Sequence, residues 1–141
     1  MYENFKNWGV NCIRFYISWD GLEPEPGVYN DKYLEEIDKK IDWAKANGIF
    51  VVLDMHQDLY GVKFSNGAPK WATLDENKKH TTGAIWSDAY MMSEAVQTSF
   101  DNFWLNKPAP DGIGIQDHYV ALWKRVAKRY AHNTTVIGYD I

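Results

Sequence analysis

Hydrophobic residues along the 141-residue chain follow two alternating patterns. Three short runs rich in β-branched and aromatic residues are typical of buried strands, and they cover 12–17, 49–55 and 136–141. Between these runs, apolar residues recur every three or four positions, as on one face of a helix. This spacing predicts helices over 33–44, about 93–105 and 119–130, and the middle helix is expected to turn Val96, Phe100, Phe103 and Trp104 inward.

The alternation of strands with helices predicts a parallel sheet covered by helices. No Gly-rich phosphate loop follows any strand, so the doubly wound nucleotide-binding arrangement lacks its signal. A barrel places its functional residues where strands end. The run "VVLDMHQDLYG" fits that arrangement, because an apolar strand there passes directly into Asp54, His56 and Asp58. The long segment 56–92 is then expected to be a functional loop.

Composition narrows the class of protein further. The hydrophobic fraction of 45% and the charged fraction of 24% are ordinary for a globular domain. A net charge of −4 argues against a nucleic-acid partner, and no apolar run is long enough to span a bilayer. The single cysteine, Cys12, excludes an internal disulfide and is expected in the core. Aromatic residues reach 16%, and such rings can stack on sugars as well as fill a core.

The strand ends also predict one ion pair. Side chains alternate along a strand, so His56 and Asp54 share a face if His56 points into a barrel. By the same count, Arg14 lies on one face with Tyr16 of the first strand. A buried arginine needs a carboxylate, and either Asp54 or Asp140 on the other strands can provide it.

The motifs resemble a known family. "NCIRFYISWDGLEPEPGVYN", "VVLDMHQD" and "VIGYDI" look like glycoside hydrolase family 5, whose members are (β/α)-barrel enzymes that cleave β-glycosidic bonds with retention. The resemblance implies a fragment of a (β/α)8 TIM barrel, about strands two to four with their helices, so that 1–141 is a partial catalytic domain. It also matches Arg14 to an arginine on the second strand and His56 to a substrate-facing histidine.

A narrower resemblance concerns "DMHQDLYG" together with "NGAPKWA", which look like endoglycoceramidases. Those enzymes release the intact glycan from glycosphingolipids. The resemblance implies that His56 and Asp58 bind the sugar next to ceramide. It also implies that a tryptophan contacts this sugar, namely Trp104, with Trp86 as the alternative. Arg14, Asp54 and Asp140 would support the active site. A glycolipid or β-glycan is then the expected partner, and the full enzyme is expected to contact a membrane surface.

The family's catalytic carboxylates are not expected within this chain. Its acid/base glutamate stands in Asn-Glu-Pro after the fourth strand and its nucleophilic glutamate on the seventh, so we expect the first just after Ile141. Retaining glycosidases need both carboxyl groups, and the 141 residues alone are therefore expected to be inactive. We also expect the true N-terminus to be missing, which leaves the compartment open, secretion included.

Other interpretations of these residues stay open. An endo-β-glucanase of the same family is one alternative, and a sugar-binding barrel without chemistry is another. The spacing of His56 and Asp58 could form half of a metal site, but the next histidine, His80, lies in a loop, so we expect no metal and no cofactor. Glu23 and Glu25 flank prolines in a turn and are expected to be solvated.

Overall fold

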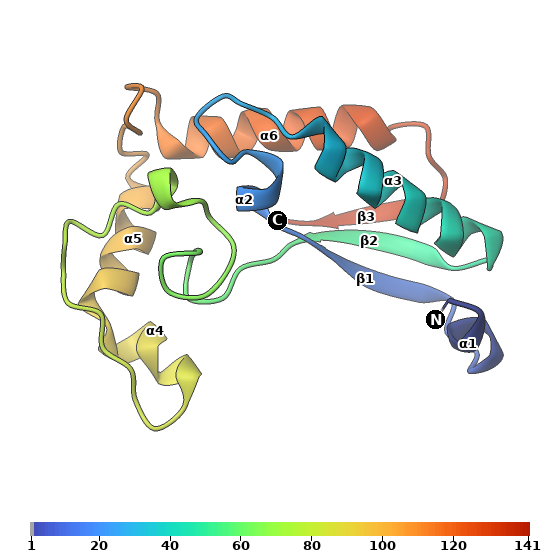
Figure 1. The fold of residues 1–141 in the computed structure, drawn as a ribbon, viewed down its shortest axis with the longest axis horizontal. Coiled ribbons are helices and arrows are strands. Elements are labelled where there is room, and N and C mark those ends of the chain that lie inside the picture. Colours follow the sequence, from blue (N-terminus) through green and yellow to red (C-terminus); the bar gives the residue numbers. More distant parts are fainter. Residues whose placement is uncertain (1) are drawn as a thin grey trace.

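The fold is a parallel three-stranded sheet with helices packed along it (Figure 1), in a computed structural model that describes residues 2–141. The strands are β1 (Cys12–Ile17), β2 (Phe50–Met55) and β3 (Val136–Asp140), in the spatial order β1-β2-β3. Both pairs are parallel, with Tyr16 opposite Asp54 and Asp54 opposite Asp140. The carboxyl ends of all three strands therefore lie together at one end of the sheet, which we call its carboxyl edge. The predicted α/β arrangement is confirmed.

The two long helices follow the predicted apolar faces. Helix α3 (Asp31–Ala46) begins after Asn30, whose side chain accepts a hydrogen bond from the Tyr33 amide, and its chain turns away at Gly48 with a φ of 68°. Helix α6 is Ile115–Tyr130. Both helices run along the same side of the sheet in Figure 1. Their buried apolar residues form one core with the strands, including Leu34, Ile37, Ile41, Leu53, Leu122 and Val126.

Helix α5 (Glu94–Trp104) is confirmed, with one correction to its inner face. Val96 is fully buried, and Phe100 and Phe103 are partly buried against the core clusters. Trp104 was expected to point inward, but it is 72% exposed. Trp104 is the last residue of the helix, so no further helical turn follows it.

Short elements order the loops. They are α1 (Tyr2–Asn7), α2 (Trp19–Leu22), α4 (Ala89–Met92) and the 3-10 helices η1 (Lys70–Ala72) and η2 (Trp86–Asp88). The last three lie within the long segment 56–92, which is therefore a folded loop. Within residues 2–141, no helix combines the length and the apolar character needed to cross a membrane.

One face of β1 carries no helix. Cys12, Arg14 and Tyr16 are exposed on it, while Ile13 and Phe15 pack toward the core. The expectation that Cys12 is buried is therefore wrong: it shares the face of Arg14, which the barrel interpretation assigns to the barrel interior. Within the described residues, β1 and β3 each pair with β2 alone, so each leaves one sheet edge without a partner strand.

Candidate functional site

A histidine between two carboxylates stands at the carboxyl edge of the sheet. His56 Nδ1 lies 3.0 Å from Asp54 Oδ2, and His56 Nε2 lies 3.5 Å from Asp58 Oδ2. Asp54 is buried, whereas the side chains of His56 and Asp58 are about 30% exposed. The contact with Asp54 fixes the ring from the protein side, so that Nε2 and Asp58 face outward together. The sequence placed these three residues at this edge, and the geometry agrees.

Arg14 joins the three strands. Its Nη2 donates to Asp54 Oδ1 at 3.0 Å and its Nε donates to Asp140 Oδ2 at 2.7 Å. The predicted ion pair is confirmed, and it involves both candidate carboxylates. Arg14 itself is 56% exposed in the side chain, so the expectation of a buried guanidinium is wrong. The result is a continuous chain of contacts from Asp140 through Arg14 and Asp54 to His56.

The backbone directly after Asp58 takes an unusual conformation. Leu59 and Tyr60 both have positive φ, 53° and 78°, a region that bulky residues rarely adopt. The Leu59 amide donates to the Tyr90 hydroxyl at 2.9 Å, and the Tyr60 amide donates to Gln57 Oε1 at 2.8 Å. Two consecutive residues are thus held in a costly conformation by side chains on both sides. This arrangement fixes Asp58 beside His56.

The segment "NGAPKWA" packs against that turn. Asn66 Nδ2 donates to Asp58 Oδ2 at 2.9 Å, and the backbones of Asp58 and Asn66 exchange hydrogen bonds of 3.1 and 3.3 Å. Gly67 has a φ of +118°, and a Cβ there would lie 2.5 Å from Gln57 Cβ. The close approach requires glycine. The sequence indicated both motifs, "DMHQDLYG" and "NGAPKWA". It did not predict that Asn66 of the second motif holds Asp58 of the first.

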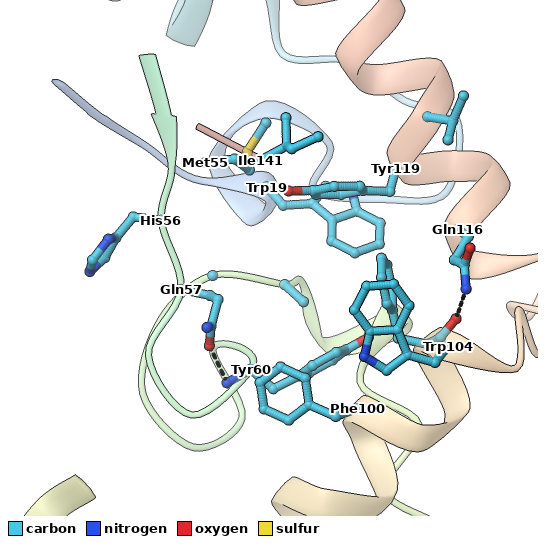
Figure 2. A pocket seen from close by; sticks show the side chains of 14 residues that line it. Trp19, Met55, His56, Gln57, Tyr60, Phe100, Trp104, Gln116, Tyr119 and Ile141 are labelled. Carbon is cyan, nitrogen blue, oxygen red and sulfur yellow. Dashed lines mark hydrogen bonds between the residues drawn. The ribbon is translucent and has the colours of Figure 1, made fainter. Parts of the chain in front are cut away.

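A pocket of about 380 Å³ opens beside this edge (Figure 2). Its walls are mostly aromatic and apolar, including Trp19, Met55, Tyr60, Phe100, Trp104 and Tyr119. Tyr60 is buried with its hydroxyl donating to the Ala72 carbonyl at 2.8 Å, and burial raises the pKa of this hydroxyl. Figure 2 shows His56 at the rim, across the pocket from Trp104 and pointing away from it. The structure therefore places Trp104 in the pocket wall but does not bring it against His56, and Trp86 does not line the pocket.

A buried polar network stands behind the pocket wall. Glu23 is fully buried, so the expectation that it is solvated is wrong, whereas Glu25 is exposed as expected. The Glu23 carboxylate accepts hydrogen bonds from Trp19 Nε1 and from the Gly27 amide, each at 2.8 Å. Its Oε1 also lies 2.9 Å from Nδ1 of the buried His118. The turn that contains Glu23 thus packs against α6. Neither the spacing of apolar residues nor the turn residues predict this contact with His118.

His118 has a second carboxylate on its other side. Its Nε2 lies 3.1 Å from Asp111 Oδ2. Both ring nitrogens of His118 therefore face carboxylate oxygens, and the ring is held between Glu23 and Asp111. The pKa of Asp111 is lowered, first by the Ile113 amide and then by His118. Of the residues that line the pocket, Trp19 is thus held by Glu23, and Tyr119 follows His118 directly on α6.

Among residues 2–141, no group of three or more His, Cys, Asp or Glu side chains is arranged to hold a metal ion. Asp54, His56 and Asp58 form instead a row of hydrogen-bonding groups with an arginine behind it. Such a row beside an aromatic pocket can bind hydroxyl groups and an apolar surface at the same time.

A parallel sheet with its polar residues at the carboxyl edge is the arrangement of a barrel enzyme. The whole chain, residues 1–141, matches the family described as cellulase (glycosyl hydrolase family 5). The chain therefore belongs to glycosyl hydrolase family 5, and the expected family is confirmed.

Within that family the chain is similar to endoglycoceramidases. It is 30% identical to the endoglycoceramidase of Cyanea nozakii, over 94% of this chain and 30% of that protein. The lactosyl-enzyme intermediate of endo-glycoceramidase II from Rhodococcus sp. superposes with a TM-score of 0.87 at 36% identity, over 97% of this chain and 33% of that one. An endogalactoceramidase gives a TM-score of 0.88 at 31% identity, over 99% of this chain and 32% of the other. The chain thus spans about a third of these relatives and has the fold of part of their barrel.

Proposed function

We propose that this chain is part of a retaining β-glycosidase that cleaves the bond between glycan and ceramide in glycosphingolipids. The observation that carries the proposal is the row Asp54-His56-Asp58, locked in place by Asn66 at the carboxyl edge of the sheet. The similarity to endoglycoceramidases supports it, since one of those structures is a complex with ganglioside GM3. The glycolipid is thus the proposed substrate, and the membrane that holds it is the proposed surface of contact.

In this proposal His56 and Asp58 bind the sugar, and Asp54 supports them. His56 Nδ1 faces Asp54, so Nε2 is the ring nitrogen that turns outward to hydrogen-bond with a sugar hydroxyl. Asp58 accepts from a neighbouring hydroxyl, and Trp104 offers its exposed ring to an apolar sugar face. Arg14 and Asp140 keep Asp54 in position. None of these groups reacts with the glycosidic bond.

The reacting groups are proposed to lie outside residues 1–141. Retention needs one carboxyl group that protonates the leaving oxygen and a second, about 5–5.5 Å away, that attacks the sugar. Asp54 and Asp58 both contact His56, and they are assigned to supporting the site and to binding the sugar, respectively. The 141 residues alone are therefore proposed to lack hydrolytic activity.

The test uses the full-length enzyme with a fluorescent ganglioside. His56→Ala removes one hydrogen bond to the sugar, so we expect kcat/KM to fall by about 5- to 150-fold, or roughly 1–3 kcal/mol. Asp58→Asn should fall in the same range. His132→Ala changes an exposed histidine before β3 and serves as the matched control. Unchanged efficiency in His56→Ala would remove this residue from the site.

A second candidate within the family is an endo-β-glucanase, and the description of the matching family as cellulase favours it. Comparing hydrolysis of cellulose and of ganglioside by the full-length enzyme separates the two. Binding of glycolipid without hydrolysis of either substrate would instead support a sugar-binding barrel.

A further inference from the structure

Four large apolar side chains project together from the folded loop after β2. They are Ile85, Trp86, Met91 and Met92, with exposed fractions of 61%, 59%, 80% and 54%. We call them the apolar tip. The tip belongs to η2, α4 and the residue before them, and in Figure 1 α4 lies far out on the side toward which the three strands run. The tip is therefore on the same side of the molecule as the candidate site.

The backbone of the tip is fixed. The Ile85 amide donates to Asp88 Oδ2 at 3.1 Å, and Gln97 Nε2 donates to the Met91 carbonyl at 2.9 Å. Ala89 is fully buried in a small cluster with Leu59 and Val96, which anchors α4 to α5. The exposure of the four side chains is thus a feature of an ordered segment, and exposing them together to water is unfavourable.

The charges around the tip indicate what covers it. Between 83 and 93 the one charged residue is Asp88, and its carboxylate turns back to the Ile85 amide. Lys78 and Lys79 are exposed before this stretch. Tryptophan, methionine and isoleucine at the centre with lysines beside them suit the boundary between lipid headgroups and acyl chains. A stable protein interface buries about 800 Å² on each partner, far more than four side chains on a short turn offer.

We propose that Ile85, Trp86, Met91 and Met92 insert into the surface of a lipid bilayer. This inference rests on the proposed function, because a ceramide-linked substrate stands in such a bilayer. Insertion of the tip holds the carboxyl edge of the sheet close to the headgroups, where the glycan is presented. The tip acts by position and takes no part in the cleavage step.

The experiment compares three forms of the full-length protein. They are the wild type, the double variant Trp86→Ser/Met91→Ser, and the control Trp43→Ser, which changes a half-exposed tryptophan on α3. Sedimentation with phosphatidylcholine vesicles that contain no glycolipid measures binding. We expect the double variant to bind at least about 10-fold more weakly, since two apolar side chains lose their burial, while the control binds as the wild type does. Hydrolysis of glycolipid in vesicles should fall with binding, and hydrolysis of detergent-dispersed glycolipid should stay the same.

Three results would overturn the inference. The wild type could fail to bind vesicles, or all three forms could bind them equally. In the third result, the wild type and the control are dimers in size-exclusion chromatography and the double variant is a monomer. The last result would assign the tip to a second copy of the chain. Tip-dependent vesicle binding by a protein that hydrolyses no glycolipid in any format would support the tip and refute the proposed function, so the two failures are distinguishable.

Discussion

Glu23 provides the sharpest test of how the pocket wall is held. The substitution Glu23→Ala removes a carboxylate that accepts from Trp19 Nε1, the Gly27 amide and His118 Nδ1. Gly27 is exposed and can turn to water, but Trp19 and His118 are only 3% and 4% exposed. Two buried ring nitrogens, Trp19 Nε1 and His118 Nδ1, would thus lose their partner.

The magnitude follows from those two ring nitrogens. An unsatisfied buried polar group costs about 1–3 kcal/mol, and Glu23→Ala leaves two of them without a partner. We therefore expect Glu23→Ala to lower the free energy of unfolding by about twice that amount. Glu23→Gln keeps the shape of the side chain but turns an amide NH2 group toward a donor, so it should also lower the free energy of unfolding. Because this variant leaves no cavity, such a loss of stability would come from the hydrogen bonds.

Urea unfolding of the whole protein, followed by tryptophan fluorescence, measures the effect. Glu25→Ala is the matched control, because Glu25 stands two residues away in the same turn and is exposed. It should change stability by less than about 0.5 kcal/mol. If Glu23→Ala and Glu25→Ala unfold at the same urea concentration, the buried polar network around Glu23 does not support the pocket wall and the reasoning fails.

Three further predictions concern other contacts. Tyr60→Phe leaves the Ala72 carbonyl without its 2.8 Å hydrogen bond and should cost about 1–2 kcal/mol in thermal or urea unfolding; no change would mean that water replaces the hydroxyl. Gly67→Ala forces a Cβ to 2.5 Å from Gln57 Cβ and should displace the turn that holds Asp58, which weaker glycolipid binding by the full-length protein would report and unaltered binding would contradict. The pKa of Asp38 is lowered, chiefly by Arg129, so this pair stabilises the fold above about pH 4 and its contribution is lost as the pH falls through the lowered pKa. Because both side chains are about a third exposed, Asp38→Asn should cost at most about 1 kcal/mol at pH 7 and progressively less as the pH falls through the lowered pKa, and melting curves over a series of pH values check this.

The amino-acid sequence determined the elements and the edge that carries the site. Short β-branched and aromatic runs and the three-to-four-residue spacing of apolar positions are local patterns, so they placed the three strands and the helices α3, α5 and α6 to within a few residues. Strand alternation also predicted that Arg14 meets Asp54 or Asp140. The motifs around His56 and Asp58 pointed to the family, which the comparison over the whole chain confirmed.

Only the tertiary structure decided which distant residues meet. Glu23 reads as a solvated turn residue, yet it pairs with His118, 95 positions away, because α6 packs over that turn. Trp104 reads as part of an inner helical face, yet it is exposed because it stands where α5 ends. Asn66 reaches Asp58 through a loop with two residues of positive φ, which no periodicity encodes. Local patterns specify what each segment can form, while contacts across the chain depend on how the segments pack, and packing fixed both the pocket wall and the exposed tip.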